Sequence, residues 1–113
     1  MKTVEVPRLD RRIVFLRAVV EENEAGELEA LAWDEFASAR ASYEPVSDGE
    51  RLRAAAVEQK TDARFRVRWT SRLAMVTGEF RFRFDGSDWR ITGIKEIGRR
   101  QFLEISAWRL VGS

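Results

Sequence analysis

The feature that most constrains the fold is a strict alternation of apolar and polar residues after Thr61. Successive side chains of a β-strand point to opposite faces of a sheet, so a period of two predicts half-buried strands with the apolar side inward. The pattern occurs in three segments: Phe65, Val67 and Trp69 among Arg64, Arg66 and Arg68; Phe80, Phe82 and Phe84 among Arg81 and Arg83; and Trp89 and Ile91 beside Arg90 and Thr92. The second half of the chain is therefore predicted to be sheet.

Turn signals divide this half into short strands. Residues 85–88, Asp-Gly-Ser-Asp, join the second and third segments as a tight hairpin. A turn after Gly98 leads to a last strand over residues 101–110, with Leu103, Ile105 and Ala107 inward. Another strand is predicted over residues 11–20, followed by an acidic turn that contains Gly26. Short strands at this spacing indicate a small antiparallel barrel or sandwich of about six strands.

Residues 27–43 are ambiguous from local sequence. Leu28, Leu31, Phe36 and Tyr43 are among the apolar residues that fall at helical spacing, and the segment is rich in Ala and Glu, which favour a helix. Residues 36–43 also alternate between small apolar and polar side chains, as a strand would. Both interpretations stay open at this point.

Residues 46–60 form a polar insertion. Ser47 and Glu50 have the spacing of a capping box, and the Ala-rich residues 50–59 follow with a thin apolar stripe. A helix of about ten residues is marginal alone and needs a partner. We expect a projecting long loop or short helix here, while residues 1–10 form an extended arm and residues 1–113 make a single domain.

Composition excludes several classes of enzyme. The 113 residues contain no cysteine and no histidine, so disulfides, thiolate or Ser-His-Asp nucleophiles and the usual Cys/His zinc sites are absent. No calcium loop, Gly-rich phosphate cradle or nucleophile elbow occurs, and Asp85 and Asp88 are residues favoured in turns. We expect no catalytic residues, no cofactor and no bound metal, and therefore no enzyme. No signal peptide or membrane span is expected either.

Charge is balanced in total but not along the chain. The net charge is +1, yet residues 1–60 carry −4 and residues 61–113 carry +5. The arginine ladders, Arg64, Arg66 and Arg68 on one strand and Arg81 and Arg83 on another, are expected on neighbouring strands of the sheet. Two interpretations of these ladders stay open: a surface that meets DNA or an acidic partner, and a solvated strand face with cross-strand ion pairs. Trp108 shares a strand face with polar residues and is a candidate interface residue. The candidate interface or DNA-facing residues are Arg64, Arg66, Arg68, Arg81, Arg83 and Trp108.

The order of these features resembles a known family. Its most specific parts are the block Ala41-Ser42-Tyr43-Glu44-Pro45-Val46-Ser47 with Gly49-Glu50, and the run Thr61-Asp62-Ala63-Arg64-Phe65-Arg66-Val67-Arg68-Trp69. With the opening strand at residues 11–15 and the closing strands, the chain resembles the head–tail joining proteins of long-tailed phages. These are also called head-closure or stopper proteins, and relatives occur in prophages and gene transfer agents.

The resemblance implies a small antiparallel β-barrel with an excursion between its second and third strands, and it implies that residues 36–43 are a strand. Family members form rings, here of six or twelve copies. They lie in the virion neck between a portal-side adaptor and tail-side terminator proteins, after assembly in the bacterial host cytoplasm. Their loops narrow the channel and retain packaged double-stranded DNA.

The predicted function is thus a structural head-closure connector, with no membrane partner. The candidate channel-facing or partner-facing residues are Ser47, Asp48, Glu50, Arg51, Arg53 and Lys60. An adaptor or tail terminator is the second hypothesis. A small nucleic-acid-binding barrel that uses the arginine ladders is the third.

Overall fold

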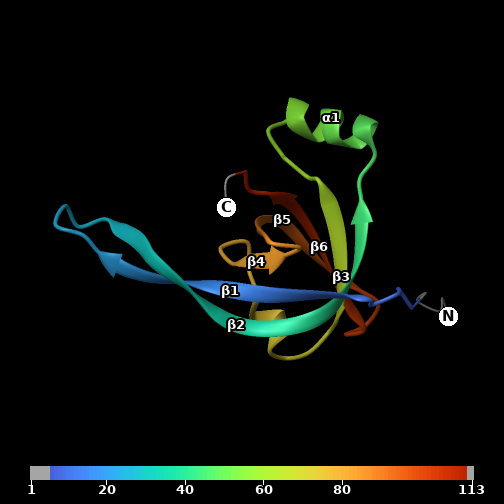
Figure 1. Ribbon diagram of the computed structural model, residues 1–113, viewed down its shortest axis with the longest axis horizontal. Coiled ribbons are helices and arrows are strands. Elements are labelled where there is room, and N and C mark those ends of the chain that lie inside the picture. Colours follow the sequence, from blue (N-terminus) through green and yellow to red (C-terminus); the bar gives the residue numbers. More distant parts are fainter. Residues whose placement is uncertain (1–5, 112–113) are drawn as a thin grey trace.

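The computed structural model describes residues 6–111, which fold into a closed antiparallel barrel of strand order β1-β2-β3-β6-β5-β4 (Figure 1). A short helix, α1, lies between β2 and β3, so the predicted fold class is confirmed. The elements are β1 Arg11–Glu22, β2 Leu28–Pro45, α1 Asp48–Ala56, β3 Ala63–Arg68, the 3₁₀ turn η1 Leu73–Met75, β4 Arg81–Phe84, β5 Ser87–Ile97 and β6 Phe102–Arg109.

The apolar side of the alternating strands fills the barrel. Phe15, Phe65 and Phe82 have no exposed surface, and the ring centroid of Phe65 lies 4.8 Å from that of Phe82 in an edge-on arrangement. Trp89 is also buried, while Trp69 is half-buried against this core. Burial of large aromatic side chains supplies most of the stabilisation of a domain this small.

The two arginine-bearing strands β3 and β4 are not sheet neighbours, contrary to the expectation that they lie side by side. β3 pairs with β2 and β6, whereas β4 pairs with β5 and β1. Two strands therefore separate them in either direction around the barrel. Alternation reveals the inward face of a strand, but strand order depends on which edges meet when the sheet closes.

The hairpin between β4 and β5 forms where the turn signal predicts it. Phe84 faces Ser87, so Asp85 and Gly86 make a two-residue loop with φ of 52° and 76°. Positive φ at both central positions is the type I′ arrangement, whose twist matches that of the flanking strands.

Residues 28–45 form one long strand, so the strand implied by the family resemblance is confirmed and the helical alternative for this segment is wrong. The N-terminal part of β2 pairs with β1 as far as Ala41, and its C-terminal part from Ala41 to Pro45 pairs with β3. Each part of this strand thus has a neighbouring strand to pair with, and such tertiary pairing overrides a modest helix propensity.

Two elements extend from the barrel (Figure 1). The far end of the β1–β2 hairpin reaches away from it along the longest dimension of the molecule, and α1 stands above one end of it. The principal extents are 55 × 34 × 26 Å. Of the predicted extended arm, residues 1–5 lie outside the described residues, and residues 6–10 belong to no helix or strand.

Candidate functional site

The insertion that carries α1 leaves the barrel through a hydrogen-bonded base. The backbone N–H of Val46 donates to the Asp62 carbonyl at 3.0 Å, which ties the start of the insertion to its end. Asp62 is itself held by β6, since its N–H donates to the Ala107 carbonyl at 2.8 Å and its carboxylate accepts from the Arg109 N–H at 3.0 Å. The ends of the insertion are thus fixed to the barrel.

Ser47 begins the helix as the sequence predicts. Its hydroxyl oxygen accepts a hydrogen bond from the Glu50 N–H at 3.1 Å, which satisfies one of the free donors of the first turn. Asp48 and Arg51 form an exposed ion pair of 2.9 Å one turn apart. In a complete capping box the Glu50 side chain would accept a hydrogen bond from the Ser47 N–H. Here it accepts one from Arg64 of β3 instead.

The Glu50–Arg64 pair connects the helix to the barrel wall. Both guanidinium nitrogens of Arg64 donate to the carboxylate, one of them at 3.1 Å, in the bidentate geometry that arginine favours. Hydrogen bonds from Arg64 lower the pKa of Glu50, with a smaller contribution from the positive charges of Arg64 and Arg53. The same bonds raise the pKa of Arg64. Both groups therefore stay ionised near neutral pH.

Helix α1 buries none of its own residues. Leu52 is 72% exposed, and Val57 just beyond the helix is 66% exposed. Within residues 6–111, Arg53 makes no hydrogen bond or ion pair, although its charge acts on Glu50. Lys60 lies with its ammonium 4.8 Å from the centre of the Trp108 ring, so two candidate residues from separate segments meet. The helix offers both apolar and cationic groups to a partner.

Four arginines of β3 and β4 contact side chains of other strands of the barrel sheet. Arg66 bonds Glu104 of β6 at 2.9 Å, and Arg83 bonds Asp88 of β5 at 3.2 Å. Arg68 and Arg81 lie against aromatic rings, with their guanidinium carbons 5.6 Å from the centre of Phe102 and 4.4 Å from that of Trp33. The Arg66–Glu104 and Arg83–Asp88 contacts are cross-strand ion pairs, as in one of the two interpretations of the ladders.

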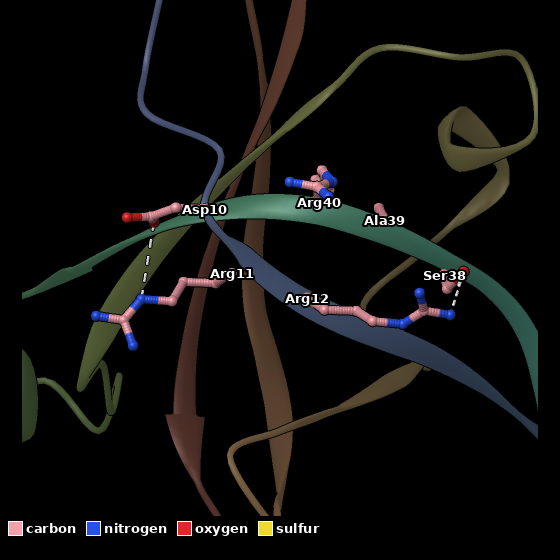
Figure 2. A pocket seen from close by; sticks show the side chains of 6 residues that line it. All are labelled: Asp10, Arg11, Arg12, Ser38, Ala39 and Arg40. Carbon is pink, nitrogen blue, oxygen red and sulfur yellow. Dashed lines mark hydrogen bonds and ion pairs between the residues drawn. The ribbon is translucent and has the colours of Figure 1, made fainter.

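Sequence reasoning missed a second cluster of arginines, which lies around the start of β1 and the adjacent part of β2. Figure 2 shows Arg11 and Arg12 running in opposite directions from β1, with Arg40 on the adjacent β2. They line a hollow of about 370 Å³ with Asp10, Ser38 and Ala39. The sequence signal for this cluster is the Arg11-Arg12 doublet. Arg40 joins the two because strand pairing places it opposite Arg12.

Within residues 6–111, no helix is long and apolar enough to span a membrane. Over the same part of the chain, no group of three or more Asp, Glu, His or Cys side chains is placed to hold a metal ion. The surfaces described above instead present charged and apolar groups suited to contacts with other macromolecules.

Two solved structures share this fold. The solution structure of protein SF1141 from Shigella flexneri 2a is 19% identical, with a TM-score of 0.69 over 97% of this chain and all of that chain. A chain from the virion of a native gene transfer agent particle is 22% identical, with a TM-score of 0.64 over 95% of this chain and all of that chain. No curated protein matches the sequence.

The family comparison covers nearly the whole barrel and its insertion. The model of the family described as phage head completion protein matches residues 4–109, which include all six strands and α1. That match agrees with the resemblance to head–tail joining proteins. The chain therefore belongs to the phage head completion protein family, whose members are structural proteins of the phage particle.

Proposed function

We propose that this protein is the head-closure, or stopper, component of a phage or gene transfer agent particle. In this role, copies assemble as a ring below the portal and its adaptor, and the ring retains packaged double-stranded DNA until the tail docks. The observation that carries the proposal is α1, a capped helix that extends from the barrel and buries none of its residues.

The helix has the properties expected of an element that is completed by assembly. A helix of nine residues is marginal in water, and most helical stability in proteins comes from packing. Here the Ser47 cap and the Glu50–Arg64 pair hold the helix in place, while Leu52 and Val57 remain exposed. Copies of α1 around a ring would cover these apolar groups, and Arg51, Arg53 and Lys60 would face DNA or acidic partners.

Other parts of the proposal follow from the position of such a ring. Its partners are a portal-side adaptor on one face and tail-side proteins on the other, and its location is the virion neck after assembly in the host cytoplasm. Arg64, Arg66, Arg68, Arg81, Arg83 and Trp108 would contribute to contacts between copies, or to DNA contacts in the third hypothesis. The carboxylate partners of Arg64, Arg66 and Arg83 favour the connector over a barrel that binds nucleic acid by itself.

Deletion of residues 48–59 tests the closure role. The ends of the insertion are hydrogen-bonded to the barrel independently of α1, so the shortened protein should fold and enter particles. We expect heads that contain the variant but lose DNA, measured as the packaged DNA that resists nuclease in purified particles. Retention of complete genomes at the wild-type level contradicts the closure role.

A matched control keeps the length of the insertion. Replacement of residues 48–59 by a flexible Gly/Ser segment of equal length preserves the connection while removing the helix and its side chains. The stopper proposal predicts leakage from this variant as well. An adaptor predicts instead that either change leaves DNA retained, and that the protein binds portal-containing heads before any tail component is present.

A further inference from the structure

The outer half of the β1–β2 hairpin is a two-stranded ribbon outside the barrel. β1 pairs with β4 only from Val14 to Leu16, and β2 pairs with β3 only from Ala41 to Pro45. Residues 18–33, here called the arm, therefore pair only with each other. An isolated two-stranded hairpin is at best marginally stable in water, so the arm has the character of an element that gains a partner.

The arm is both acidic and apolar on its surface. It contains five glutamates and no basic residue, so its net charge is −5 and the rest of the chain carries +6. Glu21 and Glu29 lie directly opposite each other on the two strands, which is an unfavourable like-charge pair. The arm also exposes large apolar side chains: Val19 at 40%, Val20 at 54%, Leu28 at 74% and Leu31 at 55%.

The barrel carries the complementary surface, here called the arginine groove. It consists of the hollow of Figure 2 and a second one of about 340 Å³, which share the β2 residues Ser38, Ala39 and Arg40. The second hollow adds apolar groups, including Leu9, Ala37 and Leu73, and two more arginines, Arg68 and Arg72. The groove thus combines positive charge with an apolar floor.

The arginine groove contains an unfavourable like-charge pair of its own. Arg12 and Arg40 are cross-strand partners, and both are exposed. Over residues 6–111, the polar contact of Arg12 is a long 3.5 Å approach to the Ser38 hydroxyl, and neither Arg12 nor Arg40 forms an ion pair there. Two adjacent guanidinium groups without a carboxylate partner form a ready site for acidic side chains.

We propose that the arm of one copy docks in the arginine groove of a second copy of this chain. The Glu21/Glu29 pair would then meet the Arg12/Arg40 pair, and each would relieve the repulsion within the other. Val19 lies two residues from Glu21 on the same face of the arm, and it would cover the apolar floor. Since the arm points away from its own barrel (Figure 1), the contact is between chains and joins two different surfaces. A contact of this kind can repeat from copy to copy, and it closes into a ring when the rotation between successive copies divides a full turn evenly.

This inference rests on the ring of the proposed function and names the surfaces that join its copies. Disulfide cross-linking of the purified full chain tests it, because the natural sequence has no cysteine. We expect Val19→Cys protein mixed with Ser38→Cys protein to form a mixed disulfide under mild oxidation. A chain with both substitutions should form a ladder of covalent oligomers, whereas each single variant alone stops at a dimer.

Charge reversal tests the pairing of the two like-charge sites. In the cross-linking chains, Glu21→Lys/Glu29→Lys or Arg12→Glu/Arg40→Glu should each reduce the mixed disulfide by about tenfold or more. Combining the reversed arm on one chain with the reversed groove on the other should restore it, which also shows that both variants are folded. The matched control is Arg90→Glu/Arg99→Glu, a pair of exposed arginines outside the groove, and it should leave the yield unchanged.

Other outcomes overturn the proposal. Arm-in-groove docking is excluded by any one of three results. The mixed disulfide is absent at millimolar protein, its yield does not recover in the doubly reversed mixture, or the Arg90/Arg99 control loses as much of it. Binding of a short DNA duplex that needs Arg12 and Arg40, without any effect of the arm on self-association, assigns the groove to nucleic acid instead. The cross-linking and deletion experiments can fail independently. If cross-linking fails but heads leak after deletion of residues 48–59, the arm contact is wrong and the closure role stands. If the covalent ladder forms but the deletion variant retains complete genomes, the closure role is wrong and the arm contact stands.

Discussion

Single residues couple the helix to the barrel and fill the barrel itself. Glu50 replaces the usual return bond of a capping box with a bidentate pair to Arg64, so one side chain links α1 to β3. Phe65, the residue next to Arg64, points to the inner face and contacts four other aromatic rings at centroid distances of 4.8 to 5.4 Å. The outward arginine and the inward phenylalanine thus serve different parts of the molecule from one strand.

Substitution of Glu50 by Gln should remove a pH dependence of α1. Since Arg64 lowers the pKa of Glu50, the pair stabilises the docked helix fully above the ordinary carboxyl pKa of 4.5, and this contribution is lost as pH falls through the lower folded value. Hydrogen exchange of α1 amides, compared between pH 6 and pH 3, should show wild-type loosening that E50Q lacks. Glu58→Gln should behave as wild type, because the Glu58 carboxylate lies in the same segment and forms no ion pair with any of residues 6–111.

Phe65→Ala should destabilise the barrel by about 3–5 kcal/mol, the usual range for loss of a buried phenylalanine. The side chain is completely buried, and its removal leaves a cavity among Phe82, Phe84 and Trp89. Urea unfolding of the purified protein measures the change. Leu52→Ala removes an apolar side chain that is 72% exposed, so a shift within about 0.5 kcal/mol is expected there.

At the scale of elements, the molecule combines a closed sheet with two projections. In the barrel each strand pairs with two neighbouring strands, and such closure protects a sheet from edge-to-edge pairing. The arm and α1 lack such protection, since the arm pairs only with itself and the helix buries nothing. Elements with few buried contacts open most easily and gain most from a partner.

Ser47→Ala should loosen α1 while the barrel stays intact. Loss of the cap costs about 1 kcal/mol, a large share of what holds a short helix that has no packed face. We expect faster exchange of the amides of residues 50–56, with the urea midpoint of the barrel unchanged. Ser47→Asp retains a capping oxygen and should preserve the protection; equal loosening in both variants contradicts a capping role.

At the scale of the whole molecule, charge is divided between the arm and the rest of the chain. The arm carries −5 and the remainder +6, although the total of +1 gives no sign of this division. Such an arrangement favours contact between copies, because like surfaces repel and unlike surfaces attract.

Self-association should therefore fall steeply with salt. The screening length shrinks from about 10 Å at 0.1 M to about 3 Å at 1 M, so exposed pairs between copies weaken. Sedimentation velocity of the full chain at these two ionic strengths is expected to show assemblies in the first and smaller species in the second. A distribution of species that does not change with salt would falsify an electrostatic interface.

Much of the fold follows from local sequence. Alternation of Phe65, Val67 and Trp69 with arginines indicates strands and their inner face, Asp85-Gly86 indicates the hairpin, and Ser47 indicates where α1 begins. These features are local because pleat, turn and cap depend on neighbours within a few residues. For residues 28–45 the local signal was ambiguous, and pairing with β1 and β3 decided the strand.

The β-class, the inward residues of the alternating strands and the absence of Cys and His chemistry are all readable from the amino-acid sequence. Which arginines are available to a partner depends instead on how the strands are arranged in the folded barrel. Arg64, Arg66 and Arg83 pair with carboxylates of other elements. Arg12 and Arg40 are 28 positions apart in the chain and lie opposite each other on β1 and β2, and neither pairs with a carboxylate among residues 6–111. The physical reason is that ion pairing depends on strand order and register, which are set when the barrel closes around its core.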